Sequence, residues 1–222
     1  MFSNLSQQIH LVLSQKGNPE KAHAMQAYMK NLFPFFGIPS PQRKELVKVL
    51  SQSFKINSLD KNLMNDLWRN NEREHQYLAM DFMKKYKKQL IPADIDWIES
   101  LIIQKSWWDT VDFLATHLVG YIVSQQPSLI ETHINQWSTD KNIWLNRTAI
   151  LFQLKYKEKT DFELLKRYIL QHLESKEFFI NKASGWALRE YAKTNPAAVI
   201  HFVETQPKLS GLTKREALKH QI

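Results

Sequence analysis

The stretch Trp107-Trp108-Asp109-Thr110-Val111-Asp112 holds the residues best suited to chemistry. Trp108 and Asp112 are four residues apart, so on a helix they share one face. A carboxylate beside aromatic rings is desolvated, and its natural partner is a positive charge, either a local arginine or a cationic group on a ligand. The chain as a whole carries a net charge of +8. An acid in this setting indicates a negative charge with one specific functional role, inside a groove that otherwise binds phosphates.

The two acids of this stretch have different expected roles. Asp109 and Asp112 together resemble the paired carboxylates of a glycoside hydrolase. Ser106 and Asp109, however, have the spacing of a capping box, with Ser106 at the N-cap and Asp109 reaching back to its amide. Asp112 lies a turn further into the helix, too deep for capping. An isolated aspartate there usually faces solvent, but the adjacent Trp108 favours a functional role for Asp112.

Composition and motifs exclude several classes of function. The chain has 222 residues, 43% of them hydrophobic, so a single folded domain or one continuous array is expected. Thirty Lys and Arg against 22 Asp and Glu favour a polyanionic partner. There is no cysteine, which excludes disulfides and thiolate chemistry. Without cysteine or a His-x-x-x-His pair we expect no metal, and the lack of a Gly-rich loop or Gly-x-Ser-x-Gly argues against nucleotide hydrolysis and a serine nucleophile.

The N-terminal sequence predicts neither secretion nor membrane insertion. Residues 1–17 lack a basic region followed by a sustained apolar core. No run approaches the roughly 18 apolar residues of a spanning helix. We therefore expect a cytoplasmic protein with no membrane partner. We also expect no cofactor.

The fold class is predicted to be all-α. The chain contains five glycines and no Asn-Gly or Asp-Gly pair, which argues against β-hairpins. Apolar residues recur at helical spacing, as in Val111, Leu114 and Leu118. Ser40-Pro41 and Asn195-Pro196 each pair an N-cap residue with a proline at the first helical position.

Similar segments recur along the chain and predict a repeat. Aligning their small residues selects Ala79, Ala115, Ala149 and Ala187, at separations of 36, 34 and 38 residues. Such a period is typical of two-helix solenoid repeats. We therefore predict a superhelical array of HEAT-like repeats over residues 1–222, with an irregular helical bundle as the alternative.

The alignment brings residues from different repeats together. Asp112 lies three positions before its alanine, Arg147 two before and Trp186 one before. On successive parallel helices these residues would line one concave surface, where solenoids bind ligands. Trp108 and Trp186 are then suited to stack on bases or sugars or to make cation–π contacts.

Several other residues have simpler interpretations. Arg147 is a candidate phosphate clamp, or else an ordinary surface arginine. Two lysine clusters either add salt-dependent affinity for phosphate or are solvated helix faces. Trp107 is expected to point into the array, and four further tryptophans are expected to serve packing. The clusters are Lys84, Lys85, Lys87 and Lys88, and Lys155, Lys157 and Lys159; the packing tryptophans are Trp68, Trp97, Trp137 and Trp144.

Four segments, in order along the chain, resemble the AlkD-like DNA glycosylases of the DNA alkylation repair family. The resemblance implies a superhelix of HEAT-like repeats that cradles duplex DNA. It also places the family's catalytic aspartate on Asp112, its active-site tryptophans on Trp108 and Trp186, its active-site arginine on Arg147, and a tyrosine near the lesion-facing surface on Tyr28. The segments are QAYMKNLFPFFGIPSPQRKEL (26–46), SWWDTVD (106–112), WLNRTAI (144–150) and SGWALREYAK (184–193).

The expected function is that of a monofunctional DNA glycosylase in base excision repair. Its partner is duplex DNA containing N3- or N7-alkylated purines, and a monomer suffices because a concave duplex-binding surface needs no second subunit. No lysine near the aspartate motif is placed to form a Schiff base, so lyase activity is not expected. The alternative is a non-catalytic helical-repeat scaffold that binds nucleic acid or a protein. Asp112 separates the two, since a pure DNA binder loses affinity through a carboxylate in its groove.

Overall fold

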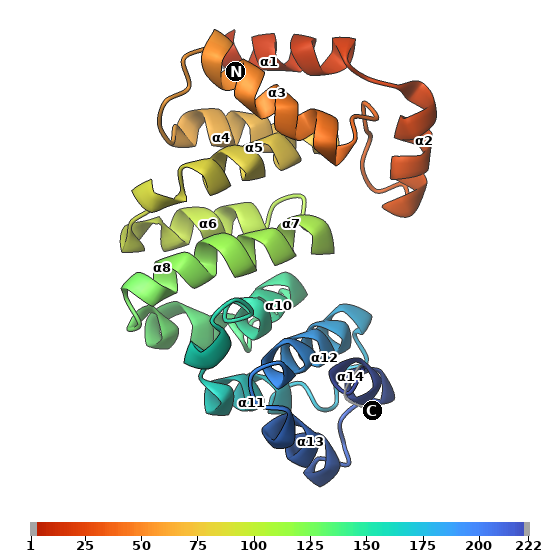
Figure 1. Cartoon of the computed structure of the whole chain (residues 1–222), viewed down its shortest axis with the longest axis vertical. Coiled ribbons are helices and arrows are strands. Elements are labelled where there is room, and N and C mark those ends of the chain that lie inside the picture. Colours follow the sequence, from red (N-terminus) through yellow and green to blue (C-terminus); the bar gives the residue numbers. More distant parts are fainter. Residues whose placement is uncertain (1–3, 220–222) are drawn as a thin grey trace. The chain divides into compact units, whose positions relative to one another are not determined.

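A computed structural model describes residues 4–219, and these form helices and turns without any strand. The predicted all-α class is confirmed. The chain folds into two compact units, residues 1–90 and 91–222 (Figure 1). One continuous array over the whole chain stays a prediction. No helix within the described residues is long and apolar enough to cross a membrane.

The first unit packs its helices around a core that includes Trp68 and Phe82. The loop that follows its second helix is tied to the fifth helix by the buried carboxylate of Glu74, which accepts hydrogen bonds from the backbone amides of Phe36, Gly37 and Ile38. These bonds satisfy backbone donors that would otherwise be buried without partners. The elements are α1 (Asn4–Gln15), α2 (Pro19–Tyr28), α3 (Ser40–Ser53), α4 (Lys61–Arg69), α5 (Arg73–Lys85) and the 3₁₀ turn η1 (Lys87–Gln89).

The second unit carries Asp112, Arg147 and the two predicted active-site tryptophans. Three of its helices, α7, α10 and α12, pack one after another in chain order. Its elements are η2 (Pro92–Asp94), α6 (Ile95–Ile102), α7 (Trp108–Phe113), η3 (Leu114–Val119), α8 (Gly120–Gln125), η4 (Ile130–Ile134), α9 (Asn135–Trp137), α10 (Ile143–Leu151), η5 (Lys157–Lys159), α11 (Phe162–Leu170), α12 (Phe178–Ala192), α13 (Pro196–Thr205) and α14 (Gly211–Ala217).

A π-helical segment begins two residues after Asp112. Helix α7, the π-helix η3 and α8 run on as one rod (Figure 1). The hydroxyl of Thr116 donates a hydrogen bond of 2.8 Å to the carbonyl oxygen of Asp112. Single π-turns within α-helices are rare, and those that occur are often found at functional sites. Nothing in the spacing of the apolar residues predicts this one.

Small residues let these helices approach closely. The aligned alanines Ala115, Ala149 and Ala187 are all buried. Gly120 is required at its position, since a β-carbon there would lie 2.4 Å from the carbonyl oxygen of Phe152. The same close approach lets the hydroxyl of Tyr156 donate to the carbonyl of Gly120 at 2.6 Å. The spacing of small residues therefore marks helix contacts within the second unit.

The predicted helix caps have mixed outcomes. Asn195 is confirmed as an N-cap, since its side chain accepts from the amide of Ala198. The assignment of Ser40 as an N-cap is wrong, because α3 already begins at Ser40 and Pro39 takes the cap position. The capping box of Ser106 and Asp109 is also wrong. Trp107 is the N-cap of α7, and the hydroxyl of Ser106 donates backwards to the carbonyl of Ile102 at 2.6 Å.

Candidate active site

A two-point ion pair joins Asp112 on α7 to Arg147 on α10. The Nε of Arg147 donates to Oδ1 of Asp112 at 2.6 Å, and its Nη2 donates to Oδ2 at 2.8 Å. A planar guanidinium matches a carboxylate in this fork geometry, which is stronger and more directional than a single contact. The repeat alignment brings these two residues to neighbouring positions, and the structure places them in contact.

The same guanidinium reaches a third helix. Its Nη1 donates to the carbonyl oxygen of Phe179, in the first turn of α12. Phe179 belongs to an aromatic cluster with Trp107 and Trp144, whose ring centroids lie 4.8 Å and 5.0 Å from its own. The two indoles are 5.6 Å apart. Arg147 and the aromatic cluster together fix α7, α10 and α12 around the carboxylate of Asp112.

Asp112 is partly desolvated but still reachable. Its side chain is 15% exposed, whereas that of Arg147 is 4% exposed. Burial raises the pKa of Asp112 above its ordinary value; the hydrogen bonds and charge of Arg147 oppose this shift, and the nearby charge of Asp109 adds to it. A carboxylate offers about four lone-pair directions, and the fork uses two of them. Asp112 therefore keeps acceptor capacity on its exposed side.

The two predicted active-site tryptophans lie on the helices that the ion pair joins. Trp108 is the first residue of α7, half-buried, and one turn before Asp112 on the same face. Trp186 is half-buried on α12, seven residues after Phe179 and so on the same side of that helix, about two turns along. Indole surface from both helices is therefore available on the faces that carry the ion pair and the aromatic cluster.

The buried position of Arg147 differs from what a phosphate clamp requires. Three of its nitrogens already donate to Asp112 and Phe179, and little of the side chain meets solvent. In this arrangement it holds the acid rather than facing outward. The lysines of the second cluster, Lys155, Lys157 and Lys159, are all exposed, and the Nζ of Lys155 lies 2.6 Å from Nε2 of His117.

The model of the family described as "DNA alkylation repair enzyme" matches residues 9–221. The chain belongs to this family. The resemblance that the four segments carry is thereby confirmed.

A solved structure supports the same assignment for the fold. The structure described as a predicted DNA alkylation repair enzyme from Enterococcus faecalis is 35% identical to this family member. The match covers 92% of this chain and 96% of that one, with a TM-score of 0.83. None of the curated proteins compared with the chain matches it.

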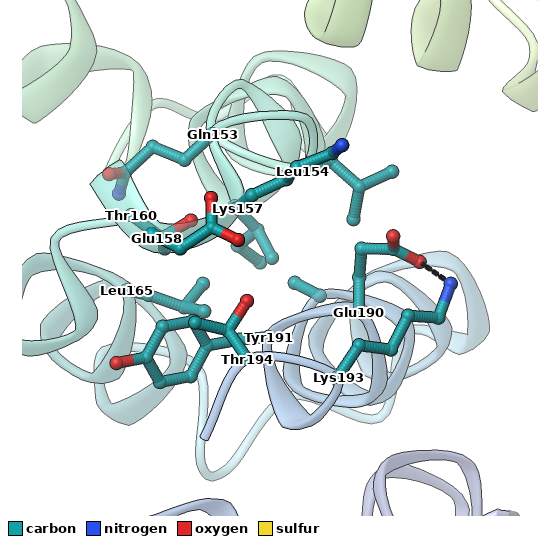
Figure 2. A pocket seen from close by; sticks show the side chains of 12 residues that line it. Gln153, Leu154, Lys157, Glu158, Thr160, Leu165, Glu190, Tyr191, Lys193 and Thr194 are labelled. Atoms are coloured by element: carbon teal, nitrogen blue, oxygen red, sulfur yellow. Dashed lines mark hydrogen bonds and ion pairs between the residues drawn. The ribbon is translucent and has the colours of Figure 1, made fainter. Parts of the chain in front are cut away.

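Tyr28 belongs to the first unit, and a small pocket of the second unit does not include the ion pair. Tyr28 ends α2 in the first unit, where its side chain is 69% exposed. Within the second unit, Figure 2 shows a pocket of about 140 Å³ between the ends of α10 and α12, lined by residues such as Gln153, Lys157 and Glu190. None of the predicted site residues lines this pocket. The family member therefore carries its candidate acid outside this pocket.

Sequence reasoning missed the supports of the acid. Trp144 was expected to serve only packing, but it stands three residues before Arg147 and joins the aromatic cluster. Phe179 contributes a backbone carbonyl, which no side-chain pattern reveals. The available signal was positional: Trp144 and Phe179 sit at helical spacing from Arg147 and Trp186. Trp107 packs inward as expected, with its indole nitrogen buried.

Proposed function

We propose that this member of the DNA alkylation repair family is a monofunctional DNA glycosylase that hydrolyses the N-glycosidic bond of N3- or N7-alkylated purines. The observation that supports it most is the carboxylate of Asp112, which the Arg147 fork holds and which is left partly exposed on the helix that also carries Trp108. A basic chain gains nothing for DNA affinity from such an acid. The carboxylate of Asp112 is useful instead for stabilising a positive charge that develops on the substrate during the reaction.

The substrate itself explains why one acid is enough. Alkylation at N3 or N7 makes the purine cationic, which weakens the glycosidic bond and makes the base a good leaving group without protonation. As the bond breaks, the sugar acquires oxocarbenium character. A fixed anion next to the developing charge lowers the barrier. Asp112 also has a free acceptor direction with which to orient the attacking water.

Each neighbouring residue has a role that follows from its position. Arg147 favours the ionised form of Asp112 and fixes the direction of its oxygens, acting through the acid. Trp108 and Trp186 offer the negative faces of their indoles to the cationic base and electron-poor sugar. Exposed lysines hold the DNA backbone, and Tyr28 contacts the duplex near the lesion.

The ion pair also suits a second function. A buried fork between α7 and α10 fixes the packing of two helices even if it performs no chemistry, as in a non-catalytic scaffold that binds nucleic acid. Such a protein binds duplex DNA but leaves alkylated bases in place.

One assay separates the two functions. Purified protein is incubated with duplex DNA that carries 7-methylguanine, and released base and abasic sites are measured. We expect release by the wild type and a loss of about 100- to 1000-fold in Asp112→Asn, the scale seen when one transition-state contact is removed. The matched control is Asp109→Asn on the same helix, which retains activity. DNA binding without release by the wild type establishes the scaffold, and release that survives Asp112→Asn removes the role assigned to the acid.

A further inference from the structure

A second cluster of chemically capable side chains lies in the first unit. His10 on α1, Glu72 at the N-cap of α5 and His75 in α5 each offer one atom that could bind a metal ion. These atoms all lie within 4.8 Å of one another. Two imidazoles and a carboxylate are the donor set of zinc sites that keep an open coordination position.

The hydrogen bonding of His75 prepares it as a ligand. Its Nδ1 lies 3.1 Å from the carbonyl oxygen of Glu72, and a carbonyl can only accept, so Nδ1 carries the proton. The lone pair of the neutral ring is then on Nε2. Histidines that bind metals almost always donate their other ring nitrogen to a carbonyl or carboxylate in this way. The side chain of His75 is fully buried, so its orientation is fixed by packing.

The Nδ1 atom of His10 gives the strongest indication of a ligand. Its Nδ1 is buried and has no hydrogen-bond partner, although a buried polar nitrogen normally finds one. That atom lies 4.0 Å from Oε2 of Glu72. Ligand atoms on one tetrahedral zinc ion lie about 3.3 Å apart, given Zn–N and Zn–O distances of about 2.0–2.1 Å. The gap between His10 and Glu72 is therefore within reach of a small side-chain movement.

The surroundings allow that movement and give the ion a way in. The rings of His10 and His75 are stacked at 5.2 Å, so one of them must turn for both to face one ion. His10 is the one able to turn, since its side chain is 40% exposed. A pocket of about 350 Å³ opens beside it, lined by Ser6, Gln7, His10, Leu11 and Asn70. The ring of Phe36 packs against both histidines, 5.4 Å from the ring of His10 and 5.5 Å from that of His75.

We propose that His10, Glu72 and His75 form a divalent-metal site in the first unit, suited to Zn²⁺, with water in the fourth position. The site joins α1 to the start of α5. It is independent of Asp112 and of the proposed glycosylase chemistry. His10 comes from α1, and Glu72 and His75 come from the start of α5, so the full ligand set is not contiguous in sequence. The absence of a His-x-x-x-His pair led to the opposite expectation.

The test is direct titration of the tag-free protein with Zn²⁺ by calorimetry. We expect one Zn²⁺ per chain and at least a tenfold weaker affinity in His10→Ala and in Glu72→Gln. The matched control is His23→Ala, which removes an exposed histidine of α2 outside the cluster and leaves affinity unchanged. Circular dichroism of each variant shows that it is folded.

Cobalt gives a second readout that does not depend on affinity. Co²⁺ bound by two imidazoles, a carboxylate and water absorbs in the visible range with tetrahedral intensity. We expect this band in the wild type and in His23→Ala but not in His10→Ala. No Zn²⁺ binding by the wild type, or binding that His10→Ala and Glu72→Gln leave unchanged, overturns the proposal.

Discussion

Two carboxylates of the second unit are held by cations in opposite electrostatic settings. Asp112 has one arginine and a nearby acid, and burial raises its pKa. Glu216 on α14 has two cations, Lys182 at 2.6 Å and Arg189 at 2.7 Å, both from α12. The hydrogen bond from Lys182 is the main reason that the pKa of Glu216 is lowered, and burial opposes it.

On the proposed function, the difference separates an acid that serves stability, Glu216, from one that serves chemistry, Asp112. The fold favours the charge on Glu216, so that ion pair gains strength where the carboxylate is ionised. At Asp112, burial disfavours the charged form of the carboxylate, and Arg147 opposes this effect. An anion that is poorly solvated but fixed in direction interacts strongly with a positive charge that develops beside it.

Removing the cation from Asp112 is expected to have the largest effect on stability. Arg147→Met leaves a buried carboxylate without its partner, and loss of one member of such a pair costs about 3–5 kcal/mol. Urea denaturation measures the change. The double variant Asp112→Asn/Arg147→Met is expected to recover part of the loss, because it no longer buries an unpaired charge. Equal stability of the single and double variants would contradict the coupling.

The pH dependence of base release follows from the raised pKa of Asp112. The reaction needs the carboxylate, so kcat/KM falls as the pH drops through a value above that of a free aspartate, about 3.9. Arg147→Lys loses the two-point hydrogen bonds that oppose the shift and is expected to move this acid limb to higher pH. Rate–pH profiles of both proteins provide the measurement. A limb that stays in place in Arg147→Lys refutes the assignment to Asp112.

Stability responds to the same group with the opposite sign. A raised pKa means that the folded state holds the proton of Asp112 more tightly than the unfolded state. The stability from this group is complete below about pH 3.9, the unfolded value, and is lost as the pH rises through the folded pKa. Melting temperatures of the wild type and Asp112→Asn across this range reveal the dependence as a difference between the two.

Sequence alone predicted the helices, their class and the neighbouring positions of Asp112 and Arg147. Apolar periodicity is a local signal and the spacing of small residues is a regular one, so both can be read from the sequence and suffice to predict helices and their repeat positions. Whether the guanidinium of Arg147 turns towards a phosphate or towards Asp112 depends on rotamers and on the carbonyl of Phe179. The π-helix after Asp112 and the cluster of His10 with Glu72 and His75 likewise depend on three-dimensional packing.

The position of Trp186 is expected to depend on the close contact between α12 and α14. A β-carbon on Gly185 would lie 2.4 Å from Cβ of Glu216 and 2.9 Å from the carbonyl oxygen of Thr213. Gly185→Ala is therefore expected to push α14 away and to cost about 1–3 kcal/mol, with weaker activity because Trp186 is the next residue. Gly211→Ala is the matched control, since a β-carbon there meets nothing within 4 Å. A similar melting temperature for both variants would refute the close packing.

The smallest effect is expected from Glu216→Gln, which leaves the carboxylate's shape and removes its charge. The side chains of Lys182 and Arg189 are 39% and 25% exposed, so solvent screens the pairs and the loss is about 0.5–1 kcal/mol. Because the folded pKa is lowered, the advantage of the wild type is present above about pH 4.3, the unfolded value, and disappears as the pH falls through the folded pKa. Denaturation of both proteins at several pH values measures this, and base release at neutral pH should stay unchanged. An activity loss as large as that of Asp112→Asn would place Glu216 in the chemistry and end the distinction between the two carboxylates.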